Sequence, residues 1–156
     1  MGVAGAGKTT VGKLLSEELG WPFYEGDGFH PPSNVEKMSR GAPLSDEDRW
    51  PWLDEIHSLV ERLIDQGQDA VLTCSALKQS YRDRLQQDAA QVEFVYLKGD
   101  YNTVWERVLT RTGHFMRAGM LVSQFQAMEE PEDALTVEIT QEPRAMVREI
   151  RTALSL

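Results

Sequence analysis

The residues best suited to chemistry stand at the start of the chain, where three glycines precede a lysine and a threonine. The stretch Gly2-Val3-Ala4-Gly5-Ala6-Gly7-Lys8-Thr9 matches the pattern G-x-x-x-x-G-K-[ST]. Glycines let the backbone approach an anion closely, so that successive N–H groups point at phosphate oxygens. A lysine at this place reaches the β- and γ-phosphates, and the threonine hydroxyl ligates Mg²⁺. The pattern predicts a nucleoside triphosphate site that includes this loop and Thr10.

A helix must follow the loop to complete such a site. Apolar residues recur at helical spacing from Val11 to Leu19, and Gly20 is typical of the position just past a helix C-terminus. The positive end of this helix would point at the phosphates. A glycine-rich turn that matches by chance is the alternative, and the helix favours the nucleotide site.

A second polar cluster, Glu25-Gly26-Asp27-Gly28-Phe29-His30, follows a short aromatic stretch that is typical of a strand. Asp27 is a candidate to accept the proton of an attacking hydroxyl. Glu25 is a candidate to hold Mg²⁺ through water. Paired acids in a turn also occur in loops that only face solvent, and these residues alone leave both interpretations open.

Cationic side chains near predicted strand ends are candidates for binding anions. Arg49, with Lys37 and Arg40, suits a carboxylate, although salt bridges with the acids at 46–48 are equally expected. Ser75 and Lys78 follow a predicted buried strand and would face a cleft. Arg82 lies one helical turn beyond Lys78. A solvated surface helix is the alternative for this cluster.

A third basic segment resembles a lid that closes over phosphates. Arg107 and Arg111 are four residues apart, share a helix face and precede Gly113 and His114. Arginines there would stabilise charge on the transferring phosphoryl group. A capping or packing role explains His114 better than catalysis.

Length and composition limit the classes of protein. A chain of 156 residues is expected to be one domain, and its single cysteine, Cys74, excludes an internal disulfide framework and a multi-cysteine metal site. A net charge of −9 disfavours nucleic acid as a partner. No apolar run is long enough to span a membrane and no signal peptide is visible, so we expect a cytoplasmic protein.

Strands alternate with helices along the chain, which predicts an α/β fold with a parallel sheet flanked by helices. Strands are predicted over 21–24, 70–74, 92–97 and 135–140, and helices over 10–19, between Ser45 and Gly67, and over 78–87, 103–109 and 143–153. Ser45-Asp46-Glu47-Asp48 is typical of a capping box at the start of the second of these helices, and His30-Pro31-Pro32-Ser33 predicts a break. A phosphate-binding loop normally follows a buried strand, but only Met1 precedes this one. We expect the central first strand to lie upstream of Met1, or this form of the chain to be compromised without it.

Along nearly its whole length the chain resembles the gluconate kinases of the small thermoresistant type. The specific matches are Gly26-Asp27 with His30-Pro31, Cys74-Ser75-Ala76-Leu77-Lys78 and Gly113-His114-Phe115, and Met120-Leu121-Val122-Ser123-Gln124-Phe125 also matches. The phosphate loop itself is generic. Three departures are Glu25, where the family often carries Asp, a short acidic segment at 129–134, and the absent first strand, which is the largest of the three.

This resemblance implies ATP- and Mg²⁺-dependent phosphorylation of D-gluconate to 6-phosphogluconate by a homodimer. It also implies the phosphate-loop NTPase fold that is shared with nucleoside monophosphate and shikimate kinases, with a lid at about 111–127. Asp27 falls on the acid that meets the acceptor hydroxyl, and Arg107 and Arg111 fall on the lid side, Arg111 with a catalytic role. The residues placed on the acceptor side are His30, Arg49, Ser75, Lys78, Arg82 and His114. Another small-metabolite kinase, such as a shikimate-type kinase, and a nucleotide-binding protein without catalysis remain alternatives.

Overall fold

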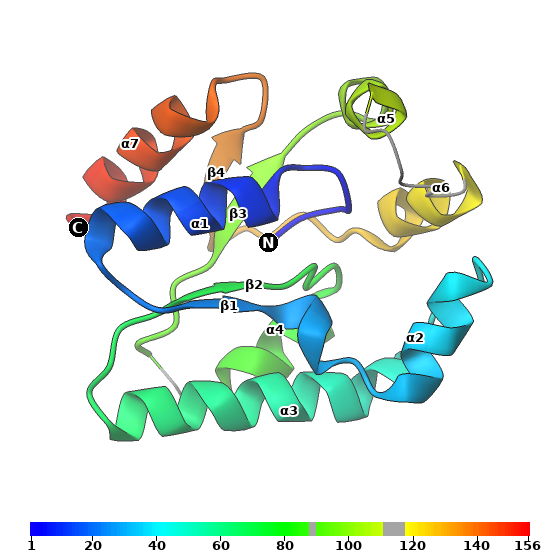
Figure 1. Cartoon of the computed structure of the whole chain (residues 1–156), viewed down its shortest axis with the longest axis horizontal. Coiled ribbons are helices and arrows are strands. Elements are labelled where there is room, and N and C mark those ends of the chain that lie inside the picture. Colours follow the sequence, from blue (N-terminus) through cyan, green and yellow to red (C-terminus); the bar gives the residue numbers. More distant parts are fainter. Residues whose placement is uncertain (88–89, 111–117) are drawn as a thin grey trace.

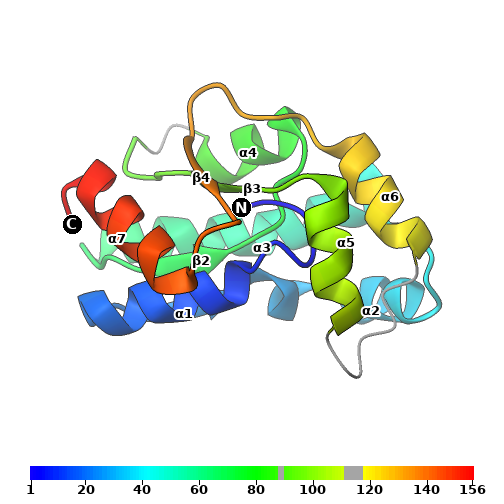
Figure 2. The same cartoon turned by 90° about the horizontal axis from the view of Figure 1, so that it is seen from above.

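Helices and strands alternate in the computed structural model, which describes residues 1–87, 90–110 and 118–156. The elements are α1 (Lys8–Leu19), β1 (Phe23–Glu25), η1 (Gly26–Phe29), α2 (Pro32–Ser39), α3 (Asp46–Asp65), β2 (Val71–Thr73), α4 (Gln79–Gln86), β3 (Val95–Lys98), α5 (Tyr101–Thr110), α6 (Ala118–Ala127), β4 (Leu135–Glu138) and α7 (Pro143–Leu154). The strands lie between α1 on one side and α4 on the other (Figure 2), and α7 packs beside α1 (Figure 1). This layering agrees with the predicted α/β class.

The strands form two parallel pairs. β1 pairs with β2, with Tyr24 opposite Leu72, and β3 pairs with β4, with Leu97 opposite Val137. In the described part of the chain no strand precedes α1, as the sequence predicted.

The backbone of Met1 and Gly2 joins the two pairs. The Leu97 amide donates to the Met1 carbonyl at 3.0 Å, and the Gly2 amide donates to the Ser75 carbonyl, just past β2, at 3.1 Å. The Met1 nitrogen also donates to the Val95 carbonyl. Met1 therefore makes the hydrogen bonds of one strand residue between β2 and β3.

Close packing brings α1 against the β1–β2 pair. A Cβ at Gly12, in the middle of α1, would lie 2.8 Å from the Phe23 ring and 2.9 Å from the Thr73 Cγ2 atom. Only glycine allows this approach, which sets the start of α1 beside the carboxyl end of β1.

The capping box at the start of α3 is confirmed, since the Ser45 hydroxyl accepts from the Asp48 amide and the Asp48 carboxylate accepts from the Ser45 amide. Two helices were missed. α2 forms where the Pro31-Pro32 pair predicted a break, because proline is well suited to the first turn of a helix. α6 forms within the predicted lid. No helix in the described ranges is long and apolar enough to cross a membrane.

Candidate active site

The phosphate loop has the backbone conformation that its sequence predicts. Gly2, Gly5 and Gly7 have φ angles of 132°, 85° and 100°. A Cβ at Gly5 would also lie 2.7 Å from the Val108 Cγ2 atom, so the loop packs directly on α5. The side chains of Val3 and Ala6 are buried, which leaves the loop backbone as the binding element.

Lys8 and Thr9 open α1 beside this loop. The Lys8 ammonium donates to the Gly2 and Val3 carbonyls at 2.9 and 3.0 Å, so its charge lies over the loop. The Thr9 hydroxyl donates to the Glu25 carboxylate at the end of β1. Thr10, the remaining residue predicted on the nucleotide side, is exposed on α1.

The Thr9–Glu25 pair has the donor chemistry that Mg²⁺ prefers. A hydroxyl and a carboxylate meet there, and Mg²⁺ is commonly held by one or two protein oxygens together with substrate phosphates and water. Among the described residues no cluster of three or more His, Cys, Asp or Glu side chains forms a closed metal cage. The oxygen donors therefore fit a magnesium ion that arrives with the nucleotide.

The turn that carries Asp27 is fixed from two sides. Its neighbour Gly26 lies against β2, where a Cβ would come within 2.2 Å of the Thr73 carbonyl oxygen. The fully buried Trp52 of α3 donates its indole N–H to the Gly26 carbonyl at 2.7 Å. Asp27 itself is exposed, so a rigid turn presents its carboxylate to solvent.

We expect Trp52→Phe to destabilise the protein and to lower its activity. The substitution leaves the Gly26 carbonyl without its partner, which costs about 1–3 kcal/mol of unfolding free energy. That loss lowers Tm by about 3–10 °C in a domain of this size. Thermal denaturation and turnover assays measure both effects. Trp50→Phe, at a half-buried tryptophan two residues earlier, is the matched control, and an equal effect of the two substitutions would contradict this role of Trp52.

Two cations lie around Tyr81 on the acceptor side. The Lys78 ammonium lies 2.8 Å from both carboxylate oxygens of Asp46, and the Tyr81 hydroxyl donates to the same carboxylate. The Arg49 guanidinium carbon lies 5.6 Å from the centre of the Tyr81 ring. Hydrogen bonds from Lys78 and Tyr81 lower the pKa of Asp46, and burial followed by the Asp46 hydrogen bond raises the pKa of Tyr81. Arg49 and Lys78, both predicted on the acceptor side, thus lie around the same tyrosine, and Lys78 is paired with Asp46.

Arg82 does not join these cations. Its side chain is 2% exposed, and its guanidinium donates to the carbonyls of Ala76 and Leu77 at 3.1 and 3.3 Å and to the Gln79 side chain at 2.7 Å. Its predicted contact with the acceptor is disfavoured, because α4 turns this side chain into the core. The position favours a structural role, in which Arg82 holds the segment between β2 and Lys78.

Arg82→Leu is therefore expected to act on stability. It leaves two backbone carbonyls without a charged donor, which costs about 2–4 kcal/mol and lowers Tm by about 5–15 °C. Arg49→Leu, at a half-buried arginine, should leave Tm nearly unchanged and weaken acceptor binding. Thermal denaturation and KM for the acceptor separate the two roles. An Arg82→Leu protein with wild-type Tm and a raised acceptor KM would restore the predicted binding role.

The other predicted cations are engaged in salt bridges. Lys37 lies 2.6 Å from the Asp48 carboxylate, and Arg40 pairs with Glu36 on the same helix. Among the three cations that the sequence grouped together, Lys37, Arg40 and Arg49, it is Arg49 that faces Tyr81.

The lid side contacts the phosphate loop through α5 and α6. Arg107 donates to the Ile139 carbonyl, and one of its guanidinium nitrogens lies 3.8 Å from where a Gly7 Cβ would stand. Gln124 of α6 accepts from the Ala4 amide at 2.7 Å. Arg111 and His114 lie outside the described residues, and of the predicted lid the structure describes α6.

Sequence reasoning missed several site residues because their partners are distant in the chain. They are Asn34, Asp46, Trp52 and Gln124. Trp52 has the spacing of a core residue and Asp46 that of a helix first turn, so neither pattern indicates a second role. A clue existed for Asn34, since asparagine is unfavourable inside a helix unless its amide has a partner.

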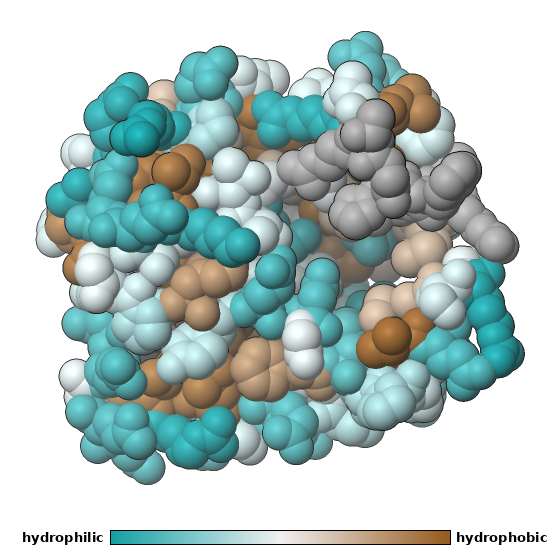
Figure 3. Space-filling model, viewed as in Figure 1, coloured by the Kyte–Doolittle hydropathy of each residue, from teal (hydrophilic) through white to brown (hydrophobic). Residues whose placement is uncertain are grey.

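The face that contains these groups is hollowed. In the space-filling view the molecule is recessed between the side that carries α2 and the side that carries α5 and α6 (Figure 3).

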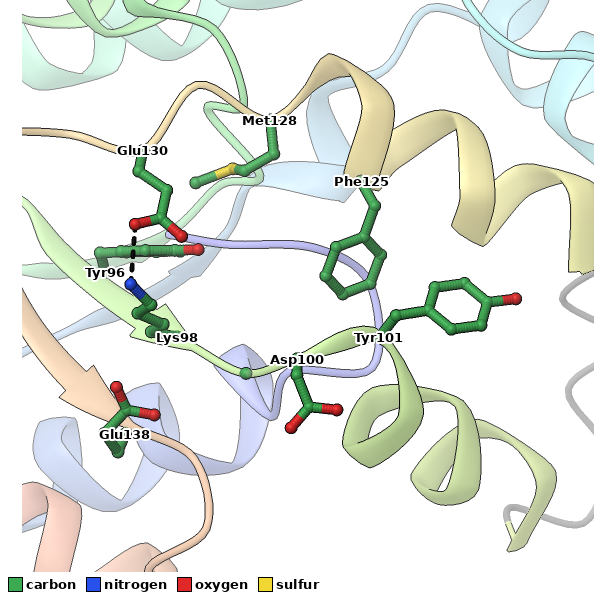
Figure 4. Close-up of a pocket in the computed structure, with 9 residues that line it drawn as sticks. Tyr96, Lys98, Asp100, Tyr101, Phe125, Met128, Glu130 and Glu138 are labelled. Atoms are coloured by element: carbon green, nitrogen blue, oxygen red, sulfur yellow. Dashed lines mark hydrogen bonds and ion pairs between the residues drawn. The ribbon is translucent and has the colours of Figure 1, made fainter.

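A separate cavity of about 410 Å³ lies at the carboxyl end of β3 and contains none of the predicted site residues. Its lining residues are Tyr96, Lys98, Gly99, Asp100, Tyr101, Phe125, Met128, Glu130 and Glu138 (Figure 4). The Lys98 ammonium pairs with the Glu130 carboxylate at 2.7 Å beside the Tyr96 ring, so its one cation is already paired.

Comparisons with known proteins place the chain in a family. The sequence pattern of the shikimate kinase family matches residues 4–149. A gluconokinase of Gluconobacter oxydans is 50% identical over 133 residues, which cover 85% of this chain and 75% of the relative. The thermoresistant gluconokinase of Escherichia coli is 40% identical over 145 residues, 90% of this chain and 83% of the relative. The crystal structure of a gluconokinase from Sinorhizobium meliloti matches with a TM-score of 0.89 and 44% identity over 99% of this chain and 89% of that chain. The predicted fold class and resemblance are confirmed, and the chain belongs to the shikimate kinase family and, within it, to the gluconokinases.

Proposed function

We propose that this protein transfers the γ-phosphoryl group of ATP to D-gluconate and forms ADP and 6-phospho-D-gluconate. The observation that carries the proposal is that three parts of a kinase site occur together: the phosphate loop, the turn with Asp27 and the cations around Tyr81. The Thr9–Glu25 hydrogen bond connects the phosphate loop to β1, and the turn with Asp27 follows directly. Arg49 and Lys78 supply positive charge around Tyr81 on the acceptor side.

The transfer is an in-line displacement. An acceptor hydroxyl oxygen forms a bond to the γ-phosphorus, and the bond from that phosphorus to the β,γ-bridging oxygen breaks with its electrons on ADP. Asp27 takes the hydroxyl proton. Lys8 and Arg107 lie at the loop and stabilise negative charge on the phosphoryl oxygens.

Thr9 and Glu25 would hold Mg²⁺, with Glu25 acting through water. When bound, the ion neutralises charge on the β- and γ-phosphates. The hydrogen bond between these two side chains is evidence that both reach the same point.

On the acceptor side, Arg49 and Lys78 bind the gluconate carboxylate, and His30 and Ser75 bind hydroxyl groups. Arg111 and His114 keep their predicted roles on the lid, Arg111 with the phosphates and His114 with the acceptor. A homodimer and a cytoplasmic location also stay predictions.

A shikimate-type acceptor is the second candidate, because the matching family pattern is that of shikimate kinase. An ATP-consumption assay with a panel of gluconate, shikimate, glucose and other sugar acids distinguishes the two. We expect turnover with gluconate at least tenfold above that with every other acceptor. Turnover with shikimate alone would replace the proposal, and tight ATP binding without turnover on any acceptor would favour a noncatalytic nucleotide-binding protein.

A further inference from the structure

Two hydrogen bonds determine how the Asn34 side chain is oriented. Asn34 is 2% exposed inside α2, and its amide nitrogen Nδ2 lies 2.7 Å from the backbone carbonyl oxygen of Asp48. A carbonyl oxygen only accepts hydrogen bonds, so the atom that faces it must be the N–H₂ group of the amide. This contact fixes the orientation of the Asn34 amide.

The same nitrogen determines the role of His30. Asn34 Nδ2 lies 3.3 Å from Nδ1 of His30, which is four residues earlier and precedes α2. An amide nitrogen has two hydrogens and no free lone pair, so it donates to Nδ1 as well as to the Asp48 carbonyl. Nδ1 must then accept, and a neutral imidazole whose Nδ1 accepts carries its proton on Nε2.

The surroundings of His30 hold its ring in place and keep it neutral. The ring stacks on the buried Trp52 with 4.1 Å between centroids and 19° between planes. Burial lowers the His30 pKa, Asp27 opposes this effect, and Arg49 lowers the pKa further. The charged groups that face the ring are thus Asp27 from η1 and Arg49 from α3, both assigned here to the acceptor side.

We propose that Asn34 is a positioning residue that holds His30 as its Nε2–H tautomer, so that His30 offers a hydrogen-bond donor to an oxygen of the acceptor. The chemical class of that acceptor, a polyhydroxy acid, rests on the proposed function. A donor of fixed direction beside Asp27 selects for an oxygen at one place in the acceptor, which contributes to specificity without adding charge.

The tautomer can be measured without any activity. The chain has three histidines, and His57 Nδ1 lies 3.2 Å from the Leu85 carbonyl, which can only accept; this hydrogen bond is shorter than the 3.4 Å contact of His57 Nε2 with the Glu61 carboxylate. His30 and His57 should therefore show opposite tautomers in two-bond ¹H–¹⁵N spectra of side chains recorded near pH 8. The signals are assigned with His30→Gln and His57→Gln. A protonated Nε2 in His30 with a protonated Nδ1 in His57 is expected, and a protonated Nδ1 in His30 would overturn the proposal.

Kinetics with conservative variants provide a second test. Glutamine places an N–H near the position of Nε2, whereas asparagine places one near the position of Nδ1. Both His30→Gln and His30→Asn should therefore raise the gluconate KM, and the increase should be about fivefold smaller for His30→Gln. ATP KM should change less than twofold in both variants. Equal gluconate KM values for the two variants would overturn the proposal.

Asn34→Asp tests the positioning role directly. A carboxylate accepts from Nδ1–H, which should reverse the tautomer in the spectra, raise the His30 pKa and add a step to the pH profile of gluconate KM. Unchanged His30 signals in a folded Asn34→Asp protein would contradict the role. If this variant does not fold, the wild-type spectrum still decides the tautomer. If the protein phosphorylates gluconate but His30 carries its proton on Nδ1, this inference is refuted and the proposed function stands. The proposed function fails only if gluconate is not phosphorylated.

Discussion

Replacing Asp27 by asparagine is expected to lower kcat for gluconate by about 10²–10⁴-fold, the range typical of a lost general base. The change removes the proton acceptor and keeps the size of the side chain. The turn itself should persist, because its anchors are the Gly26 backbone and the Trp52 indole rather than the carboxylate. Steady-state kinetics measure the loss, and ATP titration should give a Kd within about twofold of wild type.

Asp65→Asn is the matched control, since Asp65 is an exposed acid at the end of α3, and it should leave kcat unchanged. An Asp27→Asn enzyme as fast as wild type would contradict the assigned base. A loss of ATP binding in this variant would show that Asp27 acts on the nucleotide and not on the acceptor.

The second large effect is expected from an added strand between β2 and β3. Met1 already makes strand-like bonds to Val95 and Leu97, while its neighbour Gly2 bonds to Ser75. An added apolar segment of about five residues before Met1 would continue that ladder. Four buried Val, Leu or Ile side chains would add roughly 6–12 kcal/mol to the free energy of unfolding. The gain is smaller to the extent that the unfolded chain is compact and already buries part of this surface. Tm should rise by about 10–30 °C relative to an equally long Gly/Ser extension. Equal melting temperatures would contradict the expectation.

The free amine of Met1 provides an independent check of this strand. Burial, followed by repulsion from Lys8, lowers its pKa to about 5 in the folded protein. Between that value and the unfolded pKa near 8.0 the unfolded chain binds more protons, so stability rises with pH across this window. The slope should reach about 1.4 kcal/mol per pH unit at most. It should decrease in the extended chain, where a peptide N–H replaces the amine and the lowered pKa of His30 still contributes, provided that mass spectrometry shows an intact Met1. An equal slope in both chains would contradict the assignment.

Local patterns predicted the parts of the fold that depend on neighbouring residues. The loop glycines, the α1 spacing with its Gly20 stop and the Ser45 capping box act within a few residues, and each gives the predicted structure. The strands are shorter than predicted. β2, for example, spans Val71–Thr73, because strand pairing rather than apolar composition decides where a strand ends.

Long-range contacts could not be predicted from the same patterns. Lys78 meets Asp46 across 32 residues, and Ala4 meets Gln124 across 120. The direction of the Arg82 side chain is another example. A four-residue spacing from Lys78 suggested a shared face, but α4 begins after Lys78, so Lys78 precedes the helix and Arg82 points into the core.

The most direct test of the proposed function is ³¹P NMR of ATP, Mg²⁺ and D-gluconate incubated with this chain. We predict that one phosphate monoester with the signal of authentic 6-phosphogluconate forms for each ADP, and that Asp27→Asn forms it at least 100-fold more slowly. ADP with free inorganic phosphate, or a monoester at another gluconate hydroxyl, would contradict the proposed transfer.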